Sequence, residues 1–358
     1  MTTQEQNRGE ETIANAVALD ILNSKFKIPP MPANGPKLIS LVRKPIDAID
    51  VDDFVKIIDS DPGLLSLILE LANSAYFKGV DEVSSLRAAI VRVGLQETIN
   101  SVNLYFFQGL FPKIPKIDGF NVQAYWAFSW ACANAARRLG HPNMNMDVNP
   151  GELYIAGLLH GIGKLILAIQ YPFEFGKCLQ TAARLKLPLH TVELDEFGAT
   201  DAHIASKLLD IWHIPSRVCS GVRFYQNPGQ ASGKEKNMAA LLQFAYAVAA
   251  TSGIGKNGDG RVSALESTWL AGQTEMPFFK KKSQDAVVKE ILNSLKEKAE
   301  SFTGVPPKTQ GAAGYPDPEM EPHQNRAPKG RSIPVSPKSQ KTSPSNPGVF
   351  TWIRSLFH

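Results

Sequence analysis

The chain has 358 residues, of which 43% are hydrophobic and 20% are charged, and its formal net charge is +4. This composition is typical of a folded, soluble protein, and the mild charge does not by itself indicate a nucleic-acid binder. The three cysteines (Cys132, Cys178 and Cys219) lie far apart and form no CxxC pair, which argues against a zinc ribbon and favours a reducing cytoplasm. The polar N-terminal segment lacks the apolar core of a secretory signal.

The elements expected in the first third of the chain are all helical. Residues 1–27 form an N-terminal extension with one amphipathic helix, and the prolines of residues 28–36 exclude a continuous helix there. Asp61 followed by Pro62 is a helix cap followed by the residue favoured at the first helical position. Further helices are expected over residues 37–43, 52–60, 62–77, 86–93 and 95–111. Residues 28–115 therefore make a first helical lobe.

The second lobe, residues 116–302, continues the helical pattern. Helices are expected over residues 121–140, 153–169, 172–187, 200–212, 215–226, 234–252, 262–271 and 283–302. No stretch alternates convincingly between apolar and polar residues with the period of two typical of strands. The sequence therefore predicts an all-α, two-lobed fold.

The helix expected over residues 153–169 is the centre of this lobe. Asn149 can cap it, and Pro150 suits its first position. A broad apolar stripe runs along one side (Ile155, Leu158, Leu159, Ile162, Leu165, Ile166 and Ile169). The opposite side carries Gly157, His160, Gly161 and Lys164. Each interior glycine costs about 1 kcal/mol relative to alanine, so we expect a second helix or a ligand to approach closely. A buried core helix fits these residues better than a membrane span.

Four segments resemble the bacterial HDOD domain, a relative of the HD phosphohydrolases. They are DPGLLSLILELANSAYF, SSLRAAIVRVGL, ELYIAGLLHGIGKLIL and DAHIASKLLDIW, the last followed by Ile214-Pro215. The resemblance runs from about Phe26 to Gly255 and comprises several segments in order. It implies a two-lobed helical fold and a role in bacterial signal transduction through protein contacts, without phosphohydrolase activity.

The resemblance also allows a test of the metal site of HD hydrolases. Such enzymes hold one or two divalent metals with imidazole and carboxylate ligands. His160 matches the histidine of the HD pair, but Gly161 replaces its aspartate. The other ligand positions carry residues that bind metals poorly (Phe128, Tyr225, Gln226 and Tyr246). We therefore expect no metal, no cofactor and no catalytic residues, and the alternative is an atypical metal phosphohydrolase.

Two interpretations of the residues around His160 stay open. His160 and Lys164 lie one turn apart, so both can face a phosphate, and His203 is a further family-like histidine. These three residues are candidates for a groove that binds a nucleotide or cyclic dinucleotide. In the other interpretation His160 is a hydrogen-bonded core residue and Lys164 extends its ammonium to solvent.

Residues 255–266, GKNGDGRVSALE, nearly match a calcium-binding EF-hand loop. Asn257, Asp259 and Glu266 stand at ligand positions, but Gly255 replaces the first aspartate. The alternatives are a calcium loop and a glycine turn between helices.

The C-terminal residues change in character. Residues 303–349 hold 10 of the 25 prolines and few large apolar residues, which predicts a disordered linker. Its basic residues are too diluted to indicate nucleic-acid binding. Residues 350–358, FTWIRSLFH, gather apolar side chains that are candidates for binding a protein groove (Phe350, Trp352, Ile353, Leu356 and Phe357). The sequence thus predicts a catalytically inactive cytoplasmic adaptor or scaffold with protein partners.

Overall fold

The computed structural model describes residues 14–23, 28, 30–74, 76–77, 79, 81–141, 146–262, 264–273 and 284–302. Within these residues the chain is helical and contains no strand, apart from an isolated bridge between Ile117 and Phe120. The all-α class is therefore confirmed. The expected linker and the apolar motif with Phe350, Trp352, Ile353, Leu356 and Phe357 lie outside the described residues.

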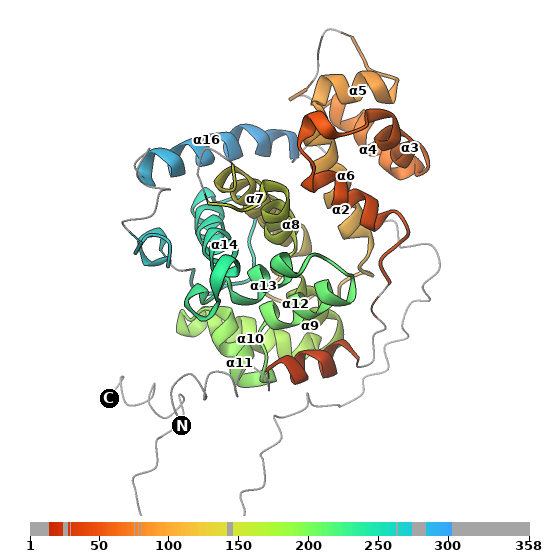
Figure 1. Ribbon diagram of the computed structural model, residues 1–358. Helices are drawn as coiled ribbons and strands as arrows, with labels where there is room; N and C mark the ends of the chain where they lie inside the picture. The colour runs from red at the N-terminus through yellow and green to blue at the C-terminus, as the bar shows by residue number, and fades with distance from the viewer. Residues whose placement is uncertain are drawn as a thin grey trace, which may run out of the picture.

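The first helices begin where the sequence places caps. Residues 14–22 are helical, and they are followed by α2 (Gly35–Arg43), η1 (Ile46–Ala48), α3 (Val51–Asp59), α4 (Pro62–Ala72), α5 (Leu86–Val93) and α6 (Leu95–Gly109) (Figure 1). Asp61 caps α4, since its carboxylate accepts hydrogen bonds from the N–H groups of Gly63 and Leu64 at 2.8 and 3.3 Å. Figure 1 shows α3, α4 and α5 together at one corner of the molecule.

The remaining helices surround α8 and its neighbours. They are α7 (Val122–Leu139), α8 (Pro150–Leu159), α9 (Ile162–Gln170), α10 (Pro172–Leu185), α11 (Leu189–Phe197), α12 (Asp201–Ile211), α13 (Ser216–Phe224), η3 (Pro228–Gln230), α14 (Gly233–Ser252), η4 (Leu265–Ser267) and α16 (Gln284–Phe302). Asn149 caps α8 as expected, with its side-chain oxygen 2.8 Å from the Gly151 nitrogen. The core is one continuous hydrophobic cluster that runs from residue 18 to residue 295.

The central helix is interrupted, contrary to the expectation of one helix over residues 153–169. The chain leaves helical geometry at Gly161, where φ is −104° and ψ is 11°, and α9 starts at the next residue. The Lys164 N–H donates to the Gly161 carbonyl, 2.9 Å away, which is a bond across three residues instead of four. His160 and Gly161 therefore form a bend between α8 and α9.

One other expected helix is absent, and one observed helix was not expected. Residues 262–271 form only the short η4, because the Trp269 N–H donates to the side chain of Gln243 on α14, at 2.7 Å, instead of to a helical carbonyl. Helix α11 was not predicted. Its buried face includes Glu193, and a carboxyl at a core position breaks the apolar pattern that marks a helix.

Glycines of α8 and α9 allow neighbouring helices to approach, as the sequence suggests for Gly157 but not for Gly163. A Cβ on Gly157 would lie 2.7 Å from the Ala133 Cα of α7. A Cβ on Gly163 would lie 2.0 Å from the Asp201 carbonyl oxygen of α12. Residues Pro150–Gln170 are the one described stretch long and apolar enough to cross a membrane, and 94% of their most apolar window is buried inside the protein.

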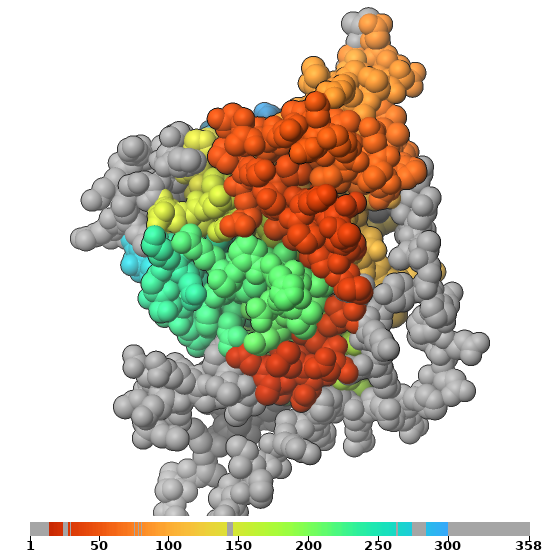
Figure 2. Space-filling model, turned by 45° about the vertical axis from the view of Figure 1, so that its right-hand side comes forward, coloured from red at the N-terminus to blue at the C-terminus, as the bar shows by residue number. Residues whose placement is uncertain are grey.

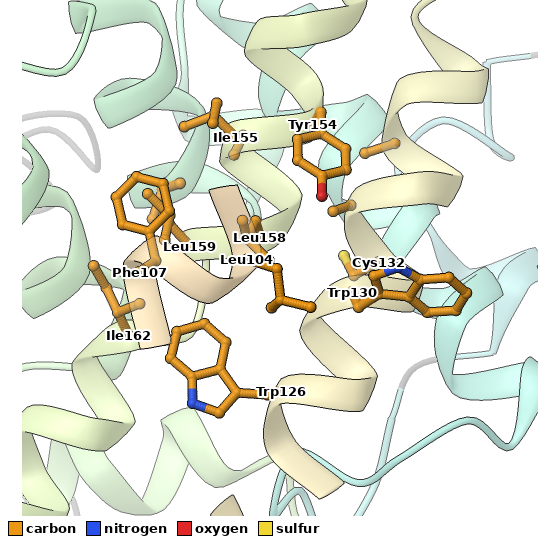
Figure 3. Packing of buried hydrophobic residues seen from close by; sticks show 14 of the residues in the cluster. Leu104, Phe107, Trp126, Trp130, Cys132, Tyr154, Ile155, Leu158, Leu159 and Ile162 are labelled. Atoms are coloured by element: carbon orange, nitrogen blue, oxygen red, sulfur yellow. The ribbon is translucent and has the colours of Figure 1, made fainter. Parts of the chain in front are cut away.

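Contacts across residue 115 join the early helices to α8. Arg43 on α2 forms an ion pair with Glu152 at 2.8 Å, and the Tyr154 hydroxyl donates to the Asn100 carbonyl of α6 at 3.1 Å. Leu104 and Phe107 of α6 pack among side chains of α7, α8 and α9 (Figure 3). Figure 2 shows the N-terminal helix along the lower edge of one face, next to the helices coloured green. The division into lobes at residue 115 stays a prediction.

Candidate functional site

His160 lies at the bend between α8 and α9 and is enclosed by aromatic rings. Its ring centroid is 5.4 Å from that of Tyr225 on α13, 5.3 Å from that of Tyr246 on α14 and 6.0 Å from that of Phe128 on α7. Tyr246 also contacts the other two rings, since its centroid is 5.5 Å from that of Tyr225 and 5.1 Å from that of Phe128. The structure therefore brings together positions at which the sequence comparison with HD hydrolases expects metal ligands. We call these four residues the His160 aromatic cluster.

His160 is a core residue with one hydrogen bond, and this part of the second sequence interpretation holds. Its Nδ1 is 2.7 Å from the Gly157 carbonyl oxygen, so Nδ1 carries the proton and donates. The side chain is fully buried, and burial lowers the pKa of His160 to about 4. The imidazole is therefore neutral at pH 7, and its Nε2 atom is buried without a hydrogen-bond partner.

Another aromatic ring lies next to the position of the missing aspartate. A Cβ on Gly161 would lie 3.2 Å from Cε2 of Tyr125, which is fully buried on α7. A side chain at residue 161 therefore requires this tyrosine to move by a few tenths of an ångström.

Lys164 is buried, so the expectation that its ammonium reaches solvent was wrong. The residue is 1% exposed, and Nζ donates to the Asn257 carbonyl oxygen at 3.1 Å and to the Asp259 carboxylate at 3.3 Å. The Asp201 carboxylate lies 4.0 Å away. Burial opposes protonation of Lys164, but the charges of Asp259 and Asp201 outweigh it and raise its pKa. The ammonium is therefore charged and held by acidic groups of the protein.

Asp259 connects this ammonium to the His160 aromatic cluster. Its carboxylate accepts a hydrogen bond from the Tyr246 hydroxyl, and the Asn257 side-chain amide donates to the same hydroxyl. The Asn257 side-chain oxygen in turn accepts from the Asp259 N–H at 3.1 Å. Burial raises the pKa of Asp259, although Lys164 opposes this shift. These contacts fix the loop after α14 against α9.

Two further buried carboxyls complete the acidic environment of Lys164. Asp201 begins α12, and its Oδ1 accepts a hydrogen bond from the Gln226 amide at 2.9 Å. Its N–H donates to Glu193 on α11 at 2.8 Å. Burial and the neighbouring Asp201 charge raise the pKa of Glu193 well above its usual range, which favours the neutral acid. We call Lys164, Asp201, Glu193 and Asp259 the Lys164 cluster.

His203 has a local structural role in the same region. The Thr200 N–H donates to His203 Nδ1 at 3.1 Å, while the Thr200 hydroxyl oxygen accepts from the His203 N–H at 3.4 Å. This reciprocal arrangement is a capping box at the start of α12. The suggested role of His160, Lys164 and His203 in binding a ligand stays a prediction, and the geometry assigns each of them a partner within the protein.

The loop of residues 255–266 uses its glycines for close packing. A Cβ on Gly255 would lie 2.2 Å from the Ala124 carbonyl oxygen, and a Cβ on Gly260 would lie 2.2 Å from that of Ala182. Asp259 and Asn257 are bonded to Lys164 and Tyr246, as described above. This geometry favours the glycine turn over a calcium loop.

A hollow of about 500 Å³ lies beside the Lys164 cluster. Its walls come from the loop after α14, from α10, from residues 118–119 and from Phe128 of α7. Asn257 and Asp259 contribute to its lining, together with apolar residues such as Leu179 and Val262. The volume falls within the range of small-molecule sites.

A model of the HDOD domain matches residues 28–228, which is more than half of the chain. The chain belongs to the HDOD domain family. A curated relative from Treponema pallidum (strain Nichols), itself uncharacterized, is 24% identical over 241 residues. The aligned region covers 66% of this chain and 44% of that protein, so the chain spans less than half of its relative's length.

Solved structures of the HDOD type share the fold. An HDOD domain protein of unknown function from Geobacter sulfurreducens superposes with a TM-score of 0.66 at 19% identity, over 82% of this chain and 99% of that one. A protein from Marinobacter aquaeolei VT8, provisionally named a signal transduction protein, gives a TM-score of 0.64 at 20% identity, over 85% and 66% of the two chains. A provisionally named phosphohydrolase from Shewanella amazonensis SB2B gives 0.57 at 22% identity, over 82% and 97%.

The side chains of this HDOD protein do not fit a catalytic metal centre. In the described residues no group of three or more histidine, cysteine, aspartate or glutamate side chains is arranged to hold a metal ion. His160 is surrounded by rings, and burial together with Asp201 raises the pKa of Tyr225 well above its usual range, so its phenolate is not available as a ligand. The nearest carboxylates contact the Lys164 ammonium instead.

Proposed function

We propose that this HDOD protein is a non-catalytic signalling component that acts by binding other proteins. The observation that carries the proposal is the His160 aromatic cluster. Hydrolysis of a phosphate ester in an HD-type site needs a metal to polarise the ester and to lower the pKa of a bound water. Phe128, Tyr225 and Tyr246 supply rings where imidazole or carboxylate ligands are needed. This arrangement supports an inert core.

A hydrolase assay on the full chain tests the catalytic half of this proposal. Bis(p-nitrophenyl) phosphate and a cyclic dinucleotide are incubated with the protein and with Mn²⁺, Fe²⁺ or Mg²⁺. Wild type and a His160→Ala variant are expected to give the same background rate. A metal-dependent rate that disappears in His160→Ala would contradict the proposal and favour an atypical phosphohydrolase.

The partner-binding half rests on the family and on the C-terminal sequence. The resemblance to HDOD proteins implies protein contacts, and the provisional name of the Marinobacter structure also refers to signal transduction. The aromatic and aliphatic residues at the chain end follow a proline-rich segment long enough to present them away from the core. A full-length Trp352→Ala, Phe357→Ala variant is expected to lose a partner in affinity capture that wild type and a Ser355→Ala control both retain. Identical partner sets for all three proteins would refute a role of the motif.

The hollow beside the Lys164 cluster favours a second candidate function, the sensing of a small ligand. Ala183 lines this hollow, whereas the neighbouring Arg184 does not. Titration calorimetry with a cyclic dinucleotide then discriminates the two functions. Saturable heat that is lost in Ala183→Trp and kept in Arg184→Trp identifies a sensor, and the absence of saturable heat in wild type eliminates this ligand.

A further inference from the structure

Helix α4 keeps apolar side chains near the surface, although its sequence is typical of a buried helix. Apart from Ser66 and Glu70, its residues are proline, glycine or apolar. A helix that is apolar on all sides is usually enclosed by its neighbours. Helices α3, α5 and α6 pack against α4, but three of its leucines are only partly buried (Leu65, Leu67 and Leu69). The described part of the chain therefore leaves α4 incompletely covered.

Further apolar side chains are exposed on the elements around α4. Val91 on α5 is 84% exposed, the highest value for a large apolar residue in the described chain. Ile46 at the start of η1 and Tyr76 after α4 are 44% and 41% exposed. We call residues 46–93 the α3–α5 corner, and Figure 1 and Figure 2 show it projecting from the rest of the molecule. Apolar side chains gathered on one projecting region are candidates for a binding surface.

The α3–α5 corner is acidic, whereas the chain as a whole is basic. Residues 46–93 hold nine acidic and four basic side chains, a net charge of −5, within a chain of formal charge +4. Two of the aspartates are compensated inside the corner, since Asp52 pairs with Arg87 and Asp53 pairs with Lys56. Other aspartates of the corner are also exposed (Asp47, Asp50 and Asp59). This surface attracts a basic segment.

The C-terminal residues have the complementary charge and apolar character. Residues 322–358 carry six basic side chains and no acidic one (Arg326, Lys329, Arg331, Lys338, Lys341 and Arg354). They include the apolar motif of residues 350–358, in which Arg354 stands among aromatic and aliphatic side chains. A segment of this kind can bury its apolar side chains on the corner while its cations approach the aspartates.

Helix α16 leads the C-terminal residues towards the same corner. Lys298, in the last part of α16, forms an ion pair with Glu97 in the first turn of α6, shortly after α5 ends. Figure 1 shows α16 running towards α5 and α6. Residues 303–349 separate α16 from the apolar motif, and a flexible linker of that length spans about 35–40 Å. This is more than twice the length of α4, which is about 16 Å, so the motif can reach the whole corner.

We infer that residues 350–358 dock on the α3–α5 corner of their own chain, with residues 326–341 along its acidic surface. The inference rests on the proposed partner-binding role of the motif and adds its regulation, because a partner has to displace the motif from the corner. The linker gives the motif an effective concentration of about 1 mM at the corner. A contact weaker than that of a stable protein complex is therefore enough to keep the motif docked.

Photo-cross-linking in the full-length protein tests this contact. The photoprobe p-benzoyl-phenylalanine replaces Val91 in one protein and Phe173 in another. Phe173 is the matched control, because it is 68% exposed but lies on α10, outside the corner. After irradiation, monomers and cross-linked dimers are separated, and the peptides joined to the probe are identified by mass spectrometry.

The probe at residue 91 is expected to join residues 350–358 within the monomer, and the probe at residue 173 is not. Trp352→Ala combined with Phe357→Ala should lower the yield at residue 91 by about tenfold or more, because buried aromatic side chains dominate such contacts. The control Ser355→Ala should leave the yield unchanged.

The charge complementarity is tested with the same probe at residue 91. Asp47→Lys combined with Asp59→Lys should lower the yield by about threefold or more, because the corner then repels the basic segment. Asp195→Lys combined with Asp210→Lys is the matched control, since these exposed aspartates lie on α11 and α12. Equal yields for the two pairs would overturn the placement of the basic residues along the corner.

Three results overturn the docking itself. They are no cross-link between residue 91 and the motif, equal cross-linking from residues 91 and 173, and a cross-link confined to dimers, which assigns the motif to a second copy of the chain. If the docking fails while Trp352→Ala, Phe357→Ala still loses a captured partner, the proposed function stands without this regulation. The expected cross-link with an unchanged partner set supports the docking and refutes the partner-binding role of the motif.

Discussion

Gly163→Ala tests whether α9 and α12 are held together as closely as the Lys164 cluster requires. The new Cβ would lie 2.0 Å from the Asp201 carbonyl oxygen and 2.7 Å from its carbonyl carbon. That is more than about 1 Å below the separation at which heavy atoms attract each other. The neighbour is backbone, so no rotamer change relieves the contact, and α12 has to move away from α9.

The expected cost is about 3 kcal/mol, at the upper end of the range for overpacked cores. For a protein of this size this corresponds to a fall of about 5 °C in the unfolding temperature. Calorimetry or circular dichroism of the full chain measures this shift. Gly109→Ala is the matched control, because a Cβ at this helical glycine meets nothing within 4 Å. It should be neutral or stabilising by up to about 1 kcal/mol. A Gly163→Ala variant as stable as the Gly109→Ala control would refute the close packing of these helices.

Two further predictions concern the residues around His160. Tyr246→Phe removes the hydroxyl that joins Asp259 to Asn257, so we expect the free energy of unfolding, measured by chemical denaturation, to fall by about 1–3 kcal/mol. The same change at the exposed Tyr76 should have little effect. Equal effects of the two substitutions would count against this hydrogen-bond network. Burial holds the pKa of His160 at about 4, against about 6.5 in the unfolded chain. Its contribution to stability is therefore complete above pH 6.5 and is lost as the pH falls towards 4, about 3 kcal/mol in total. Between pH 7 and pH 4.5 the free energy of unfolding should fall less steeply for His160→Phe than for wild type and for the exposed control His141→Phe. Parallel curves for all three proteins would contradict the burial of a neutral imidazole.

The sequence predicts the helices best where a cap and a run of apolar residues coincide. Asp61 and Asn149 each cap the helix expected after them, and the following prolines occupy the first position. Gly157 correctly indicates a close approach, because its cost in a helix requires a compensating contact. The equally close approach at Gly163 was not predicted. The bend at Gly161 was not predicted, since apolar periodicity continues across it.

The candidate site shows the limit of local patterns more clearly. The resemblance to HD hydrolases locates the positions of Phe128, Tyr225 and Tyr246, and the structure brings them to His160. The partners of Lys164 were missed, because Asp201 and Asp259 are 37 and 95 residues away in sequence and only the tertiary fold brings them together. The near match to a calcium loop did single out Asp259, but in the structure the Asp259 carboxylate accepts a hydrogen bond from the Lys164 ammonium.

The central claim of the proposed function is that the His160 aromatic cluster cannot hold the metal centre of an HD hydrolase. Elemental analysis of the full-length protein, purified without chelator, tests this claim most directly. We predict less than about a tenth of an equivalent of iron, manganese or zinc, because His160 has no companion ligands among the described residues and the nearby carboxylates compensate Lys164. A full equivalent of any of these metals, lost on replacement of His160 by alanine, would contradict the account.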